Sequence, residues 1–348
     1  MEEGAMENDQ LKVVILYNLL ERLQKGEQKD ILAEEAIIEE IEAVETSVRS
    51  LGYQCFVLSL NDEVLSVIHW LREVRPDVVV NLCESVYGNS SMEMNIPALL
   101  DLLNISYTGS PPLTIGLCLN KGRVKDILLS EGFRTPRHQI LTQPSGLRRD
   151  FSLPLIVKPV HEDGSLGITR ESVVFDEKGL TRQIEYVTQV YDQPALVEEF
   201  IDGREINVGM IEFDGKVEPL PISEIDYSGF PADIPKICGY EAKWITESVE
   251  YQESKPVCPA RVTAELKKRL ETIAVDVYRL FECRDYARVD IRVDGDENIY
   301  VIEVNPNPDI SPESGMARAI KAHGMTYADF VGGMVQKALE RRIGIHLH

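Results

Sequence analysis

Acidic, basic and amide side chains alternate along a predicted β-hairpin, residues 286–305. If its loop has four residues, Asp290 lies opposite Glu303. Arg288 then lies opposite Asn305 on the same face. Two facing carboxylates repel each other unless a cation lies between them, and with the amide the donors are all oxygen, as Mg²⁺ or Mn²⁺ prefers. Because Mg²⁺ rarely binds through protein ligands alone, the pattern also predicts phosphate oxygens and therefore a nucleotide.

The opposite face of this hairpin is apolar, which favours an organised polar surface over a scatter of solvated charges. The apolar residues expected on it are Val289, Ile291, Val293, Ile302 and Val304. A solvated strand face is the simpler alternative. Arg288 could donate two hydrogen bonds to an anionic intermediate, or form an ion pair with a neighbouring acid.

Two lysines are candidate phosphate ligands. Lys158 ends a predicted strand, 155–157, that is otherwise apolar, so its ammonium needs an anion. The glycines of the next loop, 161–167, would let backbone amides lie over phosphates, and this loop contains Ser165. A plain hairpin turn is the simpler interpretation of the loop. Lys121 begins a helix and is the second candidate, with a solvated helix lysine as its alternative.

Adenine and ribose contacts are also predicted. The strand at 195–201 offers backbone groups and Glu198 to an adenine amino group, and Glu205 follows at a distance that suits ribose hydroxyls. Surface acids are the simpler reading of both glutamates. Lys243 lies in a polar stretch, 223–259, with little periodicity, which predicts either a loop that closes over a nucleotide or a disordered segment.

The elements that must position these residues are of two kinds. Early in the chain, short apolar runs alternate with helical patterns, which predicts a parallel sheet with helices on both faces. The predicted strands are 11–16, 53–58 and 77–82, with helices at about 30–51 and 62–74. After residue 153, strands and hairpins predominate, which is typical of an α+β fold. Further helices are expected at 92–103, 119–130, 176–190, 260–281, 314–323 and 326–341.

Composition limits the partners. The chain has 348 residues, enough for two or three domains. Its 36 Lys and Arg against 58 Asp and Glu give a net charge of −22, which disfavours nucleic acid and anionic membranes. No apolar run reaches the ~18–20 residues that span a bilayer, so we expect no membrane partner and a cytoplasmic location. Six scattered cysteines without a CxxC pair predict reduced thiols in the core.

Taken in order, these segments resemble the ATP-grasp superfamily and, within it, the D-alanine:D-alanine ligases. The matching segments are NLCES, YTGS, the lysine of LNKGRVK, IVKP with GSLG, VEEFIDGRE, YEAKW and RVD with IEVNPNPD. The resemblance covers most of the chain, 79–331. It implies an ATP-grasp fold, α/β and α+β, with a Rossmann-like (pre-ATP-grasp) parallel-sheet domain at 1–109. Central and C-terminal ATP-grasp subdomains would follow at 110–201 and 202–348, the last with the metal site.

The resemblance also implies ATP and Mg²⁺ (or Mn²⁺) as cofactors and assigns roles to matching residues. The nucleotide residues would be Lys121, Lys158 and Lys243 on phosphates, Glu198 and Ile201 on adenine, and Glu205 on ribose. The metal residues would be Asp290, Glu303 and Asn305. Arg288 would stabilise the tetrahedral intermediate, and Ser165 would lie near the amino-acid site. Together with Lys243, these two residues would form the catalytic set. Ser314 matches the position that binds the second substrate's carboxylate.

Departures from the family pattern fall at substrate positions. Members that join two D-alanines have a Gly-Gly turn and then a glutamate after the first strand. In this chain, Glu21 matches that glutamate only if one residue has been deleted before it. Trp244 replaces the usual tyrosine beside the loop lysine, so the substrate region lacks its hydroxyl. Asp309 replaces a glycine of the anion hole. Gly315 follows Ser314 where a bulkier apolar residue is usual, which predicts a larger second pocket.

The sequence therefore predicts a ligase that joins a carboxylate to an amine through an acyl phosphate, with ATP converted to ADP and phosphate. The expected partners are amino acids or other small carboxylates and amines, with substrates other than D-alanine. A D-alanine:D-alanine ligase of peptidoglycan synthesis is one alternative, and a non-catalytic ATP-binding regulatory protein is another. A homodimer is left open as the assembly.

Overall fold

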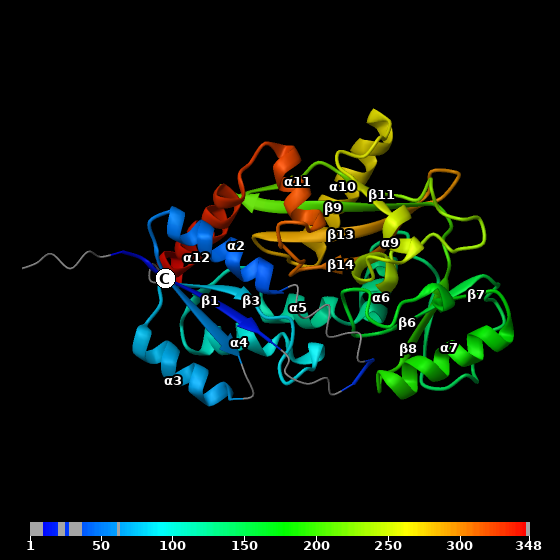
Figure 1. Ribbon diagram of the computed structural model, residues 1–348, viewed down its shortest axis with the longest axis horizontal. Coiled ribbons are helices and arrows are strands. Elements are labelled where there is room, and N and C mark those ends of the chain that lie inside the picture. The colour runs from blue at the N-terminus through cyan, green and yellow to red at the C-terminus, as the bar shows by residue number, and fades with distance from the viewer. Residues whose placement is uncertain (1–9, 20–24, 28–36, 61–62, 346–348) are drawn as a thin grey trace, which may run out of the picture.

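The structure is a computed structural model, and it describes residues 10–19, 25–27, 37–60 and 63–345. The described residues form three β-sheets and the helices that pack on them. In Figure 1 the third sheet lies above the other two. The mixture of one parallel and two antiparallel sheets confirms the predicted combination of α/β and α+β folds.

The first sheet is parallel, as predicted, with strand order β2-β1-β3-β4. Its strands are β1 (Lys12–Asn18), β2 (Gln54–Leu60), β3 (Val78–Leu82) and β4 (Ser106–Tyr107). Its helices are α2 (Ile37–Ser50), α3 (Val64–Val74) and α4 (Asn95–Leu102). Successive residues of β1 point to opposite faces, so Val13 packs with α2 and Val14 packs with α3. Both faces are covered, which is why β3 is buried throughout.

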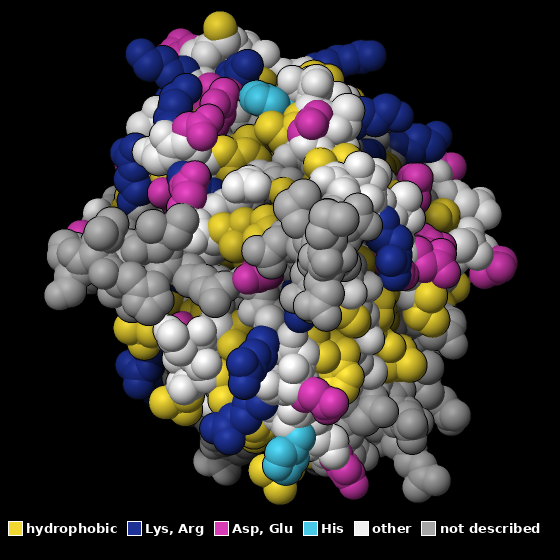
Figure 2. Space-filling model, turned by 90° about the vertical axis from the view of Figure 1, so that its left-hand side faces the viewer, with side chains coloured by type: hydrophobic (Ala, Val, Ile, Leu, Met, Phe, Trp, Pro, Cys, Tyr) yellow, Lys and Arg dark blue, Asp and Glu magenta, His cyan; other side chains and the backbone are white. Residues whose placement is uncertain are grey.

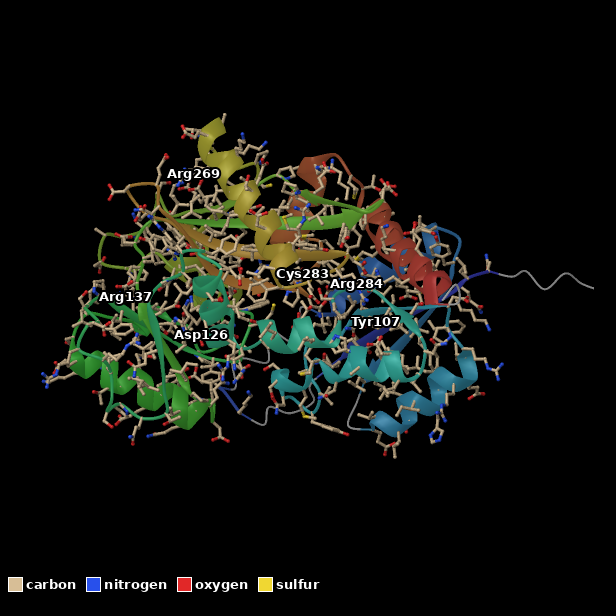
Figure 3. All side chains as sticks on the ribbon, turned by 180° about the vertical axis from the view of Figure 1, so that it is seen from behind. Tyr107, Asp126, Arg137, Arg269, Cys283 and Arg284 are labelled. Carbon is tan, nitrogen blue, oxygen red and sulfur yellow. The ribbon has the colours of Figure 1, made fainter. Side chains whose placement is uncertain are left out.

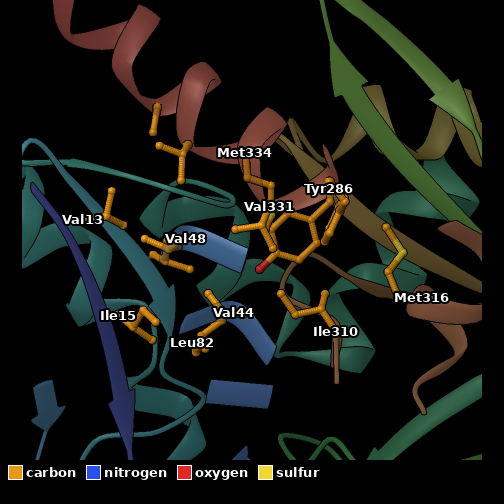
Figure 4. Close-up of a cluster of buried hydrophobic side chains, with 14 of the residues drawn as sticks. Val13, Ile15, Val44, Val48, Leu82, Tyr286, Ile310, Met316, Val331 and Met334 are labelled. Carbon is orange, nitrogen blue, oxygen red and sulfur yellow. The ribbon is translucent and has the colours of Figure 1, made fainter. Parts of the chain in front are cut away.

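The last helix, α12 (Tyr327–Ile345), returns to the first sheet. Figure 4 shows Val331 and Met334 of α12 in one cluster with Val44 and Val48 of α2. Tyr286 from the third sheet joins the same cluster. The beginning and the end of the chain therefore share a hydrophobic core.

The second sheet is antiparallel, with order β5-β8-β6-β7. Its strands are β5 (His138–Leu141), β6 (Leu155–Pro159), β7 (Val173–Val174) and β8 (Ala195–Glu199), and α7 (Glu177–Val190) packs on it. Two short 3₁₀ helices, η2 (Ser90–Met92) and η3 (Arg170–Ser172), lie in connecting segments.

The third sheet has order β12-β11-β9-β13-β14, with β10 paired to β9. Its strands are β9 (Arg204–Phe213), β10 (Lys216–Pro219), β11 (Ser223–Asp226), β12 (Lys255–Val257), β13 (Tyr286–Val293) and β14 (Ile299–Asn305). The remaining helices are α5 (Pro112–Cys118), α6 (Lys121–Ser130), α8 (Tyr240–Trp244), α9 (Val249–Glu253), α10 (Ala264–Leu280) and α11 (Gly315–His323). α10 covers the apolar face of this sheet, which leaves the polar face of β13 and β14 for a cleft.

The predicted pairing of Asp290 with Glu303 is confirmed, but the predicted four-residue loop is wrong. Val293 pairs with Ile299, so the loop begins one residue earlier than expected. A β-bulge on β14 restores the predicted register beyond it. The bulge also corrects the expected apolar face: Val301 enters the core at 1% exposure, whereas Ile302 is half-buried and lines the cleft.

Two other expectations are corrected. The stretch 223–259 is partly regular, because β11 pairs with β9 and β12 pairs with β11, with α8 and α9 between them. All six cysteines are free thiols, but Cys238 and Cys258 are half-buried and not in the core.

No helix in the described ranges combines the length and the apolar character needed to cross a bilayer. On the face drawn in Figure 2, basic and acidic side chains lie in small interspersed groups, so the net charge of −22 does not make this face uniformly acidic.

A charged junction joins the first and third sheets. Figure 3 shows Arg284 beside Tyr107, and its guanidinium lies 4.7 Å from the centre of that ring. Arg341 of α12 forms an ion pair with the buried Asp285 at 2.5 Å and donates to the Tyr107 carbonyl at 2.6 Å. Asp285 also accepts the Gly109 backbone N–H at 2.8 Å. These contacts fix the position of β13 relative to the first sheet.

Candidate active site

A cavity of about 720 Å³ lies between the three sheets. It receives side chains from β6, β8, β9, β13 and β14, and from the loops after β6 and β11. The predicted residues that line it are Lys158, Ser165, Glu198, Ile201, Glu205, Lys243, Trp244, Arg288, Asp290, Glu303, Asn305 and Ser314. Lys121 is buried behind the wall, and Glu21 lies outside the described residues.

Asp290 is held by three side chains on the polar face of the third sheet. Arg288 donates two hydrogen bonds to its carboxylate, at 2.8 and 2.9 Å, so the ion-pair alternative for this arginine holds in the structure. Asn207 of β9 donates to Asp290 at 2.7 Å, and Asn305 of β14 donates at 3.0 Å. Burial raises the pKa of Asp290 in spite of the neighbouring guanidinium.

Glu303 lies across the strand pair from Asp290 and faces several cations. Its Oε2 is 3.5 Å from Nζ of Lys121, and its Oε1 lies 3.4 Å from the Asn305 amide nitrogen. Burial by itself would raise the pKa of Glu303, but Lys121, Lys158 and other nearby cations outweigh burial and lower it. Glu303 is therefore a permanent anion beside the cavity.

The donor set fits a hard divalent cation. Asn305 donates its amide nitrogen to both Asp290 and Glu303, so the three side chains converge on one place, and the amide must turn for its oxygen to face a cation there. Their oxygen atoms are the ligands that Mg²⁺ or Mn²⁺ prefers. In the part of the chain that the structure describes, no three His, Cys, Asp or Glu side chains gather as a metal site by themselves. A cation here would thus also need the amide oxygen and oxygen atoms from a ligand.

Glu198 lies between two lysines, so its carboxylate is not free to bind an adenine amino group as predicted. Its Oε1 is 2.5 Å from Nζ of Lys158, and its Oε2 is 2.7 Å from Nζ of Lys125. Burial would raise its pKa, but the two ammonium groups outweigh burial and lower the pKa to about 2. The carboxylate predicted to meet adenine is therefore already occupied by ion pairs. The backbone after Glu198, as far as Ile201, still lines the cavity.

The ammonium of Lys121 is bound by the loop that follows β6. It donates to the Glu162 carbonyl at 2.5 Å and to the Asp163 carboxylate at 2.8 Å. Burial alone would lower the pKa of Lys121, whereas Asp163 and Glu303 reverse this effect and raise it. In this arrangement, Lys121 fixes the loop and does not line the cavity itself, but its partners Glu162, Asp163 and Glu303 do.

The loop 161–168 and the segment 238–244, which includes the short helix α8, form a cover that we call the roof loops. Ser165 donates to the Cys238 carbonyl at 2.7 Å, and the Trp244 indole donates to the Gly164 carbonyl at 3.1 Å. Ser165 has a φ of +64°, a left-handed conformation that a non-glycine residue adopts at a cost. The roof loops are therefore held together directly over the cavity.

Lys243 belongs to the roof loops, and its positive charge lies on the side of the candidate metal ligands Asp290, Glu303 and Asn305. It contributes to the low pKa of Glu303, and it lines the cavity. Among the described carboxylates, none lies within ion-pair distance of its ammonium. A cationic side chain of this kind is suited to bind an anionic ligand such as a phosphate.

Glu205 and its neighbours form the end of the cavity predicted for ribose. Its Oε2 accepts from the Tyr227 hydroxyl at 2.6 Å and from Arg292 at 2.7 Å. The second carboxylate oxygen accepts no hydrogen bond from a described residue. Glu205 thus keeps one oxygen for a ligand hydroxyl.

Sequence reasoning missed two residues of the site, Asn207 and Arg292, and gave Lys125 no role separate from that of Lys121. Arg292 alternates with Arg288 and Asp290 on one strand face, so period-two spacing could have found it. Lys125 lies one helical turn after Lys121, so the sequence could have predicted that its side chain also points inward. Asn207 has no such signal, because only the pairing of β9 with β13 brings it opposite Asp290.

The end of the cavity beside the first sheet is acidic. Glu40 accepts the Ile310 N–H at 3.1 Å, and Glu93 accepts from the Asn307 amide at 3.1 Å. Burial and neighbouring carboxylates raise the pKa of both Glu40 and Glu93. Ser314 lies nearby on the wall, where its hydroxyl caps α11 by accepting the Ala317 N–H at 3.1 Å.

Comparison with known proteins places the chain in a family. The family described as "D-ala D-ala ligase C-terminus" matches residues 129–336. The chain is 33% identical over 267 residues to the uncharacterized protein y4sG of Sinorhizobium fredii, covering 77% of this chain and 76% of that protein. It is 30% identical over 257 residues to a D-alanine–D-alanine ligase of Bordetella petrii, covering 73% of this chain and 74% of the relative.

Solved structures share the fold. A D-alanine–D-alanine ligase from Bacillus anthracis complexed with ATP matches with a TM-score of 0.74 and 24% identity, covering 96% of this chain and 99% of the other. The D-alanine–D-alanine ligase from Coxiella burnetii matches with a TM-score of 0.70 and 17% identity, covering 97% and 96%.

Proposed function

The chain belongs to the D-alanine–D-alanine ligase family of ATP-grasp proteins, and we propose that it joins a small carboxylate to an amine through an acyl phosphate, with ATP as the energy source. Membership of this family of ATP-dependent C–N ligases agrees with the resemblance seen in the sequence. The proposal adds two points to family membership: a mechanism through an acyl phosphate, and substrates other than a pair of D-alanines.

One observation carries the mechanism: a single cavity wall combines Asp290, Glu303 and Asn305 with the cationic Arg288 and Lys243. Phosphoryl transfer needs positioning and charge stabilisation more than it needs a protein nucleophile. Oxygen ligands for a metal ion, the positive charges of Arg288 and Lys243, and a cover that limits water supply those needs.

Asp290, Glu303 and Asn305 would hold Mg²⁺ or Mn²⁺, which when bound neutralises charge on the phosphates. In the first step, a substrate carboxylate oxygen attacks the γ-phosphorus, and the bond to ADP breaks. Lys243 and Lys158 bind the γ-phosphate oxygens. Lys158 is already oriented for this by Glu198, 2.5 Å away.

In the second step, an amine nitrogen attacks the acyl carbonyl, the bond to phosphate breaks, and the amine gives up a proton to leave an amide. The carbonyl oxygen becomes an anion in the tetrahedral intermediate. Arg288 can exchange one of its two hydrogen bonds to Asp290 for a bond to this oxygen. The roof loops exclude water that would otherwise hydrolyse the acyl phosphate. Ser165 holds the roof through the Cys238 carbonyl.

Substrate binding is proposed at the acidic end of the cavity. Glu40 and Glu93 are buried there with raised pKa values, and a substrate ammonium group that binds beside them would stabilise their charged forms. Trp244, Asp309 and Gly315 stand where the family resemblance implies a tyrosine, a glycine and a bulkier apolar residue, which supports a different pair of substrates. Synthesis of D-alanyl-D-alanine is the second candidate, and the Bordetella petrii relative at 30% identity favours it.

Phosphate release tests this proposal. The purified chain is given Mg-ATP and every pairwise combination of the proteinogenic amino acids, their D-forms and small diamines, and the products of active pairs are identified by mass. The proposal expects one or a few active pairs and weak release with D-alanine alone. Strong turnover with D-alanine alone would establish the second candidate. Tight binding of Mg-ATP without phosphate release from any pair would indicate a non-catalytic ATP-binding protein.

A further inference from the structure

Three residues at the start of α11 share one face of the helix and line the cavity: Ser314, Gly315 and Arg318. Positions three and four apart lie on one side of a helix, and the Arg318 N–H bonds to the Ser314 carbonyl at 3.2 Å. The opposite face, with Met316 and Ile320, is buried in the cluster of Figure 4. The helix therefore cannot rotate, and Arg318 is fixed toward the cavity.

The guanidinium of Arg318 has unused donors. Its Nη1 donates to the Glu313 carbonyl, and its Nε is buried without an acceptor. Within the described residues, it makes no other hydrogen bond and no ion pair. Burial lowers the pKa of Arg318, and Glu313, Cys258 and Asp309 offset only part of that effect. A half-buried guanidinium in this condition is stabilised by any anion that reaches it.

Gly315 leaves the path to this guanidinium open. A Cβ placed on Gly315 would meet only Nη2 of Arg318 within 4 Å, at 3.9 Å. A longer apolar side chain at this position would therefore lie across the guanidinium. The backbone of Gly315 is not left-handed, so the position accepts other residues. The absence of a side chain at residue 315 exposes Arg318 to the cavity.

Anion binding elsewhere on this wall is limited. The Asp309 carboxylate accepts the Ser311 N–H at 2.7 Å and so occupies a backbone donor that faces the same region. The Ser314 oxygen accepts a bond from the helix, but its hydroxyl hydrogen is still available to a ligand. The wall thus offers two separate anion positions, one at the Ser314 hydroxyl and one at Arg318.

We propose that Arg318 determines specificity by binding a side-chain carboxylate of the amine substrate, so that this substrate is an amino dicarboxylate. The inference rests on the proposed function and adds the substrate class to it. The α-carboxylate lies at the Ser314 hydroxyl, and the second carboxylate accepts from Nη2 of Arg318 across Gly315. A neutral amide of the same shape cannot form the charge-assisted bond.

Paired substrates that differ in one group test this directly. The enzyme receives Mg-ATP, the carboxylate partner from the active pair, and as amine either glutamate or glutamine, and either aspartate or asparagine, in both D- and L-forms. We expect at least one acid to exceed its amide by about 10- to 100-fold in kcat/KM, as charge-assisted hydrogen bonds usually allow. Calorimetry of the same compounds in the presence of a non-hydrolysable ATP analogue gives the dissociation constants independently of turnover.

Four variants separate specificity from structure. Arg318→Met removes the charge and should abolish the preference for the acid by raising the KM for the acid. Arg318→Lys should restore part of the preference. Gly315→Leu leaves Arg318 in place but covers it, and should weaken the preference as well. Lys321→Met removes an exposed charge from the same helix and should change nothing.

The outcomes are distinct. If active pairs exist but acids and amides are used equally well by the unchanged enzyme, the role of Arg318 is wrong and the ligase function stands. An acid preference that persists in Arg318→Met would also refute the role. If no pair releases phosphate, the proposed function itself fails and this inference with it.

Discussion

Replacing Glu198 by glutamine should destabilise the protein strongly, because two buried ammonium groups depend on this one carboxylate. Lys125 and Lys158 lie 2.7 and 2.5 Å from its two oxygens, and Glu198 is 1% exposed. Glutamine keeps the shape but not the charge. Both lysines would then be buried without a counter-charge, which usually costs about 3–5 kcal/mol when one partner of a buried pair is removed.

The pKa of Glu198 gives a second route to the magnitude. A carboxyl whose pKa falls from 4.5 to about 2 on folding contributes about 3 kcal/mol to the free energy of unfolding. Because the folded pKa is the lower one, this contribution is complete above about pH 4.5 and disappears as the pH falls toward 2. The two routes agree on about 3 kcal/mol at pH 7.

Urea unfolding of the natural protein and of Glu198→Gln, repeated from pH 7 down to pH 3, measures this difference. The gap between the two proteins should be about 3 kcal/mol at pH 7 and should narrow below about pH 4.5. Glu199→Gln, the next residue on β8, removes a carboxylate paired with the exposed Arg137 and should cost less than about 1 kcal/mol. A gap of under about 1 kcal/mol at pH 7, or one that does not change with pH, would refute the reasoning.

Three further predictions follow from single contacts. Glu303→Gln should lower turnover by at least ~10³-fold and should also lower the thermal unfolding temperature, because it removes the negative charge that faces the buried Lys121 at 3.5 Å; near-normal activity would contradict the metal-type site. Trp244→Phe removes the bond to the Gly164 carbonyl, so the dissociation constant for ATP, measured by calorimetry, should rise about 3- to 10-fold; unchanged binding would show that the roof does not need this bond. Arg341→Met leaves the buried Asp285 without its ion-pair partner and should lower stability by about 3 kcal/mol in urea unfolding, and a loss below about 1 kcal/mol would show that this junction does not need the pair.

The hairpin of β13 and β14 was readable from sequence because its polar and apolar residues alternate with period two. The pairing of Asp290 with Glu303 was correct although the assumed four-residue loop was wrong, because the bulge compensates for the longer loop. The bulge at Ile302 was not readable, because Val301 and Ile302 are equally apolar and either could face the core. Tertiary packing against α10 decides between them.

Other elements could not be predicted for local reasons. No helix was predicted at 112–118, although proline is favoured at the first position of a helix and Pro112 begins α5. Strands β11 and β12 have four and three residues, too short for a periodic signal, and exist through pairing with β9 and with each other. The partners of Glu198 were hidden for a similar reason, since Lys125 and Lys158 come from separate elements that only the folded chain brings together.

The central claim is that a substrate carboxylate is activated by transfer of a phosphoryl group, and isotope labelling tests it most directly. The active carboxylate substrate is prepared with ¹⁸O in its carboxyl group and turned over with Mg-ATP and its amine partner. An acyl phosphate predicts that each released phosphate carries one ¹⁸O atom from the substrate. Release of unlabelled phosphate during product formation would contradict the account.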